Sequence, residues 1–168
     1  VLSHEFADFT VGAGEEQLGN CQSWTLNNET ELWINAVELE QNEASHHSNW
    51  TYVPDDQFPG PDGVWKCKDR SYSQLAAALA GGVLYAQSTQ AGKEVQKFPN
   101  GAAVRVPPHA RIIGDVHLLN TSTESVTGHA KLSIYALPAS EVTIKLAPFH
   151  LTFSVLDIPP KARSRFEA

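Results

Sequence analysis

Short segments rich in strand-forming residues, each bounded by proline, glycine or a polar turn, recur along almost the whole sequence. Two clear examples are Leu32–Val37 and Ala110–Leu119, the second of which follows Pro107 and Pro108. β-Branched and aromatic residues favour strands, whereas proline and glycine interrupt them. The pattern therefore predicts an all-β protein, in which the strands bury one face against each other.

The strand-like segments are about nine in number and recur at regular spacing, which predicts an antiparallel β sandwich of jelly-roll type. One short helix is expected at Tyr72–Ala80, because Ser71 or Ser73 can cap its first turn and Gly81-Gly82 can end it. The other expected strands are Phe6–Val11, Ala44–Val53, Val83–Ala86, a short strand through Val104 and Val106, Val126–Leu137, Val142–Leu146 and Phe149–Leu156.

The chain length suits one domain with a hydrophobic core. Of its 168 residues, 42% are hydrophobic and 18% are charged, which is an ordinary globular composition. We expect this domain to span residues 1–160, because Pro159-Pro160 breaks the last strand-like segment. Lys161–Ala168 is charged and polar, and we interpret it as a tail or a linker.

The charge of the chain limits its partners. The formal net charge is −7, whereas binding to nucleic acid or to an anionic membrane surface needs a basic face. No apolar run is long enough to span a bilayer, so no membrane partner is expected. Val1–His4 lacks the basic and apolar regions of a signal peptide, so we expect either a cytosolic protein or a trimmed N-terminus.

His46 and His47 form the only adjacent histidine pair in the sequence. Neutral imidazole is the commonest transition-metal ligand, and it suits copper, zinc, iron and nickel. Successive side chains of a strand point to opposite faces, so both rings can reach one ion only where the strand twists, bulges or ends. A third ligand has to come from a distant strand, and we name His117. The alternatives are a chance pair and, for His117, a histidine packed in the core.

The two cysteines, Cys21 and Cys67, lie on either side of the histidine pair in the sequence. They can be free thiols, a redox pair or one structural disulfide. A bridge would close a long loop, for which chain entropy predicts a stabilisation of about 4 kcal/mol. A bridge would also imply an oxidising compartment, and the residues alone leave all three states open.

Other short motifs carry less information. Asn28, Asn49 and Asn120 begin Asn-X-Ser/Thr sequons, which we interpret as chance matches because a glycan at two of them would crowd the histidines. The sequence has no nucleophile elbow, no phosphate-binding glycine loop and no His-Glu-X-X-His helix. No pair of carboxylates stands out as an acid and base.

The order of these features resembles a known family. A cysteine, a His-His pair and a second cysteine are followed by Phe98–Gly101 and by a strand that ends in Asp115–Asn120. This order is similar to that of the N-terminal domain of the copper type II, ascorbate-dependent monooxygenases, the family of peptidylglycine α-hydroxylating monooxygenase and dopamine β-monooxygenase. The likeness runs from about Phe6 to Ile158 and so covers nearly the whole chain, although each motif is short.

The resemblance implies a jelly-roll β sandwich that holds one copper ion through His46, His47 and His117. It implies a disulfide between Cys21 and Cys67, and with it a secreted, periplasmic or other extracytoplasmic location. In the family this copper site handles electrons that ascorbate or another small donor supplies. It passes them to an oxygen-activating copper in a second domain, so a downstream catalytic domain is an expected partner.

The chain also departs from the family pattern. Ser48 follows the histidine pair where the family usually has Met, and the cysteines of other family disulfides are missing. The chain contains no Met and no His-X-His, so it lacks the ligands of the second copper site. We therefore expect an electron-transfer domain that does not hydroxylate a substrate by itself. Whether the chain is part of an enzyme is not decided by its sequence. The alternatives are a copper or zinc carrier, an interaction module with the same fold, and a domain with its own oxygen chemistry on one copper ion.

Overall fold

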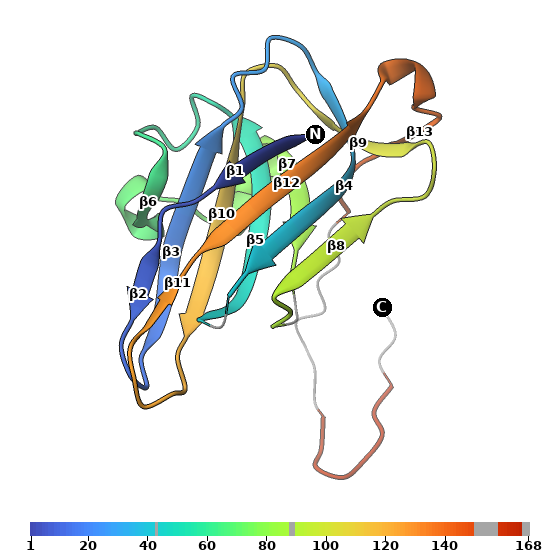
Figure 1. Cartoon of the computed structure of the whole chain (residues 1–168). Helices are drawn as coiled ribbons and strands as arrows, with labels where there is room; N and C mark the ends of the chain where they lie inside the picture. The colour runs from blue at the N-terminus through green and yellow to red at the C-terminus, as the bar shows by residue number, and fades with distance from the viewer. Residues whose placement is uncertain (43, 88–89, 150–157, 166–168) are drawn as a thin grey trace.

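The protein is an all-β sandwich, as the sequence predicts. A computed structural model describes residues 1–42, 44–87, 90–149 and 158–165, and within these ranges it contains thirteen strands and one α-helix. The strands form two large sheets that lie face to face (Figure 1). All strand pairs except one are antiparallel in the described part of the chain.

The first sheet is centred on two long strands, β4 and β12. Its strand order is β1-β12-β4-β9-β13, and β8 also pairs with β4. The exception to antiparallel pairing is the short contact between β13 and β9. The strands of this sheet are β1 (Leu2–Glu5), β4 (Leu32–Gln41), β8 (Lys93–Lys97), β9 (Ala102–Val106), β12 (Ala130–Leu137) and β13 (Ile144–Leu146).

The second sheet carries both segments that contain the candidate ligands. Its order is β6-β3-β10-β5-β7, so the histidine strands β5 and β10 are direct neighbours at its centre. The strands β2 and β11 pair with each other as a separate two-stranded sheet. The strands are β2 (Phe9–Val11), β3 (Glu16–Thr25), β5 (Ser45–Pro54), β6 (Gly63–Lys66), β7 (Gly82–Ala86), β10 (Ala110–Leu119) and β11 (Val126–Gly128).

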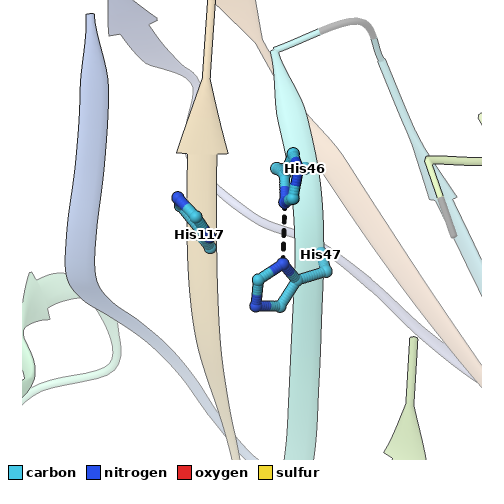
Figure 2. Close-up of side chains that lie close together, drawn as sticks. All are labelled: His46, His47 and His117. Atoms are coloured by element: carbon cyan, nitrogen blue, oxygen red, sulfur yellow. Dashed lines mark hydrogen bonds between the residues drawn. The ribbon is translucent and has the colours of Figure 1, made fainter. Parts of the chain in front are cut away.

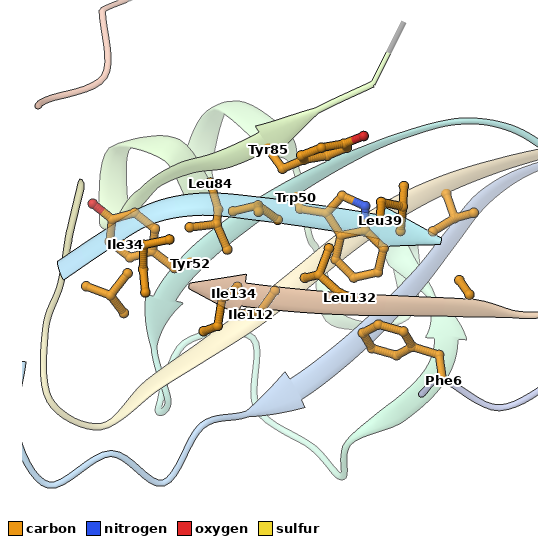
Figure 3. Close-up of a cluster of buried hydrophobic side chains, with 14 of the residues drawn as sticks. Phe6, Ile34, Leu39, Trp50, Tyr52, Leu84, Tyr85, Ile112, Leu132 and Ile134 are labelled. Atoms are coloured by element: carbon orange, nitrogen blue, oxygen red, sulfur yellow. The ribbon is translucent and has the colours of Figure 1, made fainter. Parts of the chain in front are cut away.

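The main core lies between the two sheets. Large apolar side chains of β4, β5, β10 and β12 meet there and exclude water, which is the main force that holds the sheets together (Figure 3). Trp50 lies at its centre against Gly114, where an added Cβ would come within 2.6 Å of the indole ring. The largest fully buried apolar side chains include Trp50, Tyr85, Ile34, Leu39, Ile112, Leu132 and Ile134.

A second, smaller core covers the outer face of the β3-β10-β5 sheet. It is formed under the helix α1 (Gln74–Ala80) and the 3-10 turn η1 (Cys67–Arg70). Cys21 of β3 and Cys67 of η1 form a disulfide here, with an S–S distance of 2.07 Å. The disulfide prediction is therefore confirmed, and the bridge ties the strand next to His117 to the turn that leads into α1.

The sequence missed four strands, namely β1, β3, β6 and β8. The segment now seen as β3 was not expected as a strand, yet its central residues Asn20, Gln22 and Ser23 are buried, because two of them have polar partners. Lys66 Nζ donates to Asn20 Oδ1 at 2.6 Å, and Trp65 Nε1 donates to Ser23 Oγ at 3.1 Å. β8 is a lysine-rich strand that pairs with β4 of the first sheet, and β1 and β6 are four-residue strands at the edges of the two sheets.

Several boundaries also differ from expectation. Of the expected strand Phe6–Val11, only Phe9–Val11 is a strand, β2, and the separate strand β1 ends before it at Glu5. The helix begins at Gln74 rather than Tyr72, with Ser73 as its cap: Ala76 N donates to Ser73 Oγ at 3.2 Å. The expected strand Phe149–Leu156 lies outside the described residues except for Phe149. The short 3-10 turn η2 (Ala139–Glu141) precedes β13. No helix in the described ranges is long and apolar enough to cross a membrane.

Candidate metal centre

A bulge in β5 places both histidines of the pair on one face of the sheet. His47 pairs with His117 of β10, and Ser45 pairs with Leu118, so His46 is an extra residue with no partner in the register. Ser45 and Ser48 are consequently both buried, at 5% and 1% exposure, while the two histidines between them are half-buried on the outer face. This is one of the three ways in which adjacent side chains can reach a single ion.

His117 points to the same face from the neighbouring strand. Its neighbours Val116 and Leu118 are both buried in the core, so strand alternation turns the imidazole outward. The sequence prediction that His117 lies beside the pair is confirmed. Figure 2 shows the three imidazoles together, two from β5 and one from β10.

The three rings form a compact group. One potential ligand atom from each histidine lies within 4.8 Å of the other two, and the ring centroids are 4.7–5.0 Å apart. Nδ1 of His46 and Nδ1 of His47 are 2.8 Å apart and share one hydrogen bond (Figure 2). Metal–imidazole bonds are about 2.0–2.1 Å long, so small side-chain rotations would bring the three nitrogens around one ion.

The third histidine is held by a carboxylate that the sequence did not suggest. Nε2 of His117 lies 2.8 Å from Oε1 of Glu16, which comes from β3. A carboxylate accepts, so Nε2 carries the hydrogen and the Nδ1 lone pair is left for a metal. Glu16 gave no signal in the sequence, because its contact with His117 depends on how β3 pairs with β10.

The electrostatics keep His47 in its ligating form. Burial lowers the pKa of His47 below the ordinary imidazole value of 6.5, because it disfavours the charged ring. The neighbouring His117 and His46 lower this pKa further when they are positive. The carboxylate of Asp115 acts in the opposite direction. His47 is therefore neutral at neutral pH, as a metal ligand has to be.

A second group of polar side chains adjoins the histidines on the same face. Gln74, the first residue of α1, donates from Nε2 to Oδ2 of Asp115 at 2.9 Å and accepts from Nδ2 of Asn49 at 3.1 Å. Asp115 lies two residues before His117 on β10, and Asn49 lies two residues after His47 on β5. Strand alternation therefore predicts that both side chains share the face of the histidines. The role of Gln74 could not be foreseen, because it depends on where α1 lies against the sheet.

An open cavity gives access to the histidine pair. It has a volume of about 450 Å³ and is lined by His46, His47, Gln87 and Gln90. Gln87 N donates to the carbonyl oxygen of Ser48 at 2.9 Å, which ties this wall of the cavity to the histidine strand. A small molecule could therefore reach two of the three imidazoles from solvent.

The remaining histidines do not join this group. His4 stacks on Trp24, with ring centroids 5.2 Å apart, and His109 and His129 are exposed. His150 lies outside the described residues. Within the described ranges, no other three histidine, cysteine or carboxylate side chains lie close enough together to hold a metal ion.

The sequon asparagines make hydrogen bonds within the fold. Asn120 is buried, and its Nδ2 donates to the carbonyl oxygens of Val11, Gly12 and Glu124. Asn28 Nδ2 donates to two carbonyl oxygens. Asn49 is the one beside the histidines, and its Nδ2 donates to Gln74.

The donor set fits a transition-metal ion. Three imidazoles without a thiolate suit copper, zinc, iron or nickel, and the half-exposed face leaves coordination positions open. The structure therefore shows a group that could hold a metal ion, without selecting which one. Neither the models of known protein families nor the sequences of curated proteins match this chain.

Proposed function

We propose that the chain is a copper-binding, electron-transfer domain that holds one ion through His46, His47 and His117. The observation that carries the proposal is the β5 bulge, which turns two adjacent imidazoles toward a third on the next strand. Strands alternate by default, so a bulge at this residue needs a reason. A shared metal ion provides one.

The chain's own residues suit such a role. Bound copper would supply a one-electron Cu(II)/Cu(I) couple at this position. The three histidines present nitrogen donors, and burial keeps His47 neutral. The cavity beside His46 and His47 admits a small reductant of the ascorbate type. Since the chain contains no Met, an oxygen-activating copper with a Met ligand would have to be supplied by another domain or protein.

The same proposal includes an extracytoplasmic location. The disulfide between Cys21 and Cys67 is typical of proteins from oxidising compartments. The net charge of −7 disfavours nucleic acid and anionic membranes as partners, which leaves small electron donors and a catalytic domain as the proposed ones.

The test is copper loading followed by electron paramagnetic resonance. We expect one Cu(II) per chain, a signal that ascorbate abolishes, and no signal from the site after His117→Ala. His129→Ala removes an exposed histidine outside the group and is the matched control. A wild-type protein without a Cu(II) signal, or an unchanged signal in His117→Ala, would contradict the proposal.

One observation favours an alternative. Nδ1 of His46 and Nδ1 of His47 already satisfy each other at 2.8 Å, so the pair needs no metal to be hydrogen-bonded. The chain would then be an interaction module, or a copper or zinc carrier if it binds a metal tightly without redox turnover. Metal analysis of the purified protein separates these functions. The absence of metal would indicate an interaction module, whereas zinc, or copper that ascorbate does not reduce, would indicate a carrier. Hydrogen peroxide production by the copper-loaded chain would instead indicate its own oxygen chemistry.

A further inference from the structure

Glu16 makes a direct side-chain contact with the candidate site. Its Oε1 lies 2.8 Å from Nε2 of His117. We propose that Glu16 is a positioning residue, which fixes the tautomer and the ring orientation of His117 so that Nδ1 faces the other two imidazoles. Its effect on copper rests on the proposed function, whereas its effect on the imidazole can be measured in the metal-free protein.

A second bulge puts Glu16 on the correct face. Between β10 and β3, Val116 pairs with Asn20 and Leu118 pairs with Gln17, so β3 holds one extra residue opposite His117. Asn20 is buried on the inner side with Val116. In a regular strand Glu16, four positions away, would also face inward. The extra residue reverses this alternation and turns Glu16 outward, to the side of His117.

The bulge has a local cause in the sequence. Gly19 has a left-handed backbone with φ of +64°, a conformation that glycine adopts at little cost. An added Cβ at Gly19 would meet no atom within 4 Å, so nothing crowds this side of β3. The two bulges, at His46 and at Gly19, therefore lie on the two strands that flank His117. Each of them adds one side chain to the outer face around it.

The geometry favours a positioning role over ligation by Glu16. The atoms that lie close enough together to hold one ion come from the three imidazoles alone, among the residues that the structure describes. The carboxylate occupies Nε2, on the opposite side of the ring from Nδ1. A histidine ligand commonly donates its second nitrogen to a carboxylate in this way, which raises its basicity as a ligand.

The other carboxylate on this face is engaged elsewhere. Asp115 is two residues from His117, but its Oδ2 accepts a hydrogen bond from Gln74 at 2.9 Å. The His117 side chain is only 16% exposed, whereas that of Glu16 is 55% exposed. Glu16 is thus a solvent-facing group that can be changed without opening the core, which makes its role testable.

The first experiment uses metal-free protein with ¹⁵N-labelled histidine. Above the ordinary imidazole pKa of about 6.5, we expect nitrogen shifts that show a fixed Nε2–H tautomer for His117. Glu16→Ala should give a mixture of tautomers, and Glu16→Gln should retain the wild-type tautomer because its amide oxygen still accepts. Glu5→Ala, which removes an exposed strand carboxylate with an ion pair to Lys131, is the matched control. Unchanged His117 shifts in Glu16→Ala would overturn the proposal.

The second experiment measures copper affinity. Loss of such an outer partner commonly weakens metal binding about 10- to 100-fold, and we expect this for Glu16→Ala, with a smaller loss for Glu16→Gln. An affinity of Glu16→Ala equal to that of wild type and Glu5→Ala would overturn the role in metal binding. If the wild-type protein binds no copper, the proposed function fails, and the tautomer experiment alone then decides the role of Glu16.

Discussion

His47 links the titration of one imidazole to the stability of the fold. Its pKa is lowered in the folded protein, so between this pKa and 6.5 the unfolded chain binds a proton that the folded chain does not. The free energy of unfolding therefore falls as the pH decreases through this window. We expect a steeper loss of thermal midpoint in metal-free wild type than in His47→Gln, from pH-dependent unfolding curves. Parallel curves would contradict the assignment, since His4, whose pKa is also lowered by burial, is present in both proteins.

Gly114 lies where the main core leaves no room for a side chain. An added Cβ would come within 2.6 Å of the Trp50 ring, and this ring is fully buried between the sheets. Gly114→Ala should lower the free energy of unfolding by about 1–3 kcal/mol, because the indole has to move. Denaturant titration measures this change. Gly92→Ala, at an exposed position whose nearest atom to an added Cβ is 3.3 Å away, should change it much less.

At the scale of residues, the sequence predicted the histidines better than their neighbours. His46 and His47 stood out because they are adjacent, and His117 because its segment reads as a strand. Glu16 and Gln74 were missed because both contacts depend on tertiary placement, one through a bulge in β3 and one through the docking of α1. No local pattern encodes either of these.

At the scale of elements, the disulfide is a covalent link between the histidine sheet and the segment that covers it. It joins β3 to η1 and lies in the small core under α1. The double variant Cys21→Ala and Cys67→Ala should lower the free energy of unfolding by about 4 kcal/mol, since the unfolded chain without the bridge has more conformational freedom. Urea unfolding of the variant and of the oxidised wild type measures this difference. A loss below about 1 kcal/mol would mean that the bridge contributes little through chain entropy.

The elements also show where sequence patterns are informative. β4 and β10 were expected because they are rich in apolar and β-branched residues, and α1 because Ser73 can cap it. β3 was wrongly left out, because a strand can bury polar residues when Lys66 and Trp65 supply partners for them. Such partners come from another strand, so the segment alone does not reveal them.

At the scale of the whole molecule, the candidate site lies outside the main core of the sandwich. The main core lies between the sheets, and the histidines lie on the outer face of one sheet, which they share with the smaller core under α1. The fold class followed from strand and turn signals alone. The described residues contain thirteen strands rather than about nine, because the missed strands are either short or polar and carry little apolar pattern.

The bulge at His46 has a consequence for how such a protein can arise. If His46 were deleted, Ser45 and His47 would be adjacent in the sequence. They would still pair with Leu118 and His117, respectively, and the ladder between β5 and β10 would be regular. Loss of a single codon would thus remove one of the three imidazoles and leave every other strand pairing in place. The reverse event, a one-codon insertion, would convert an ordinary sandwich surface with two histidines into a three-histidine group. A lineage could therefore gain or lose this group by one mutation without passing through an unfolded ancestor.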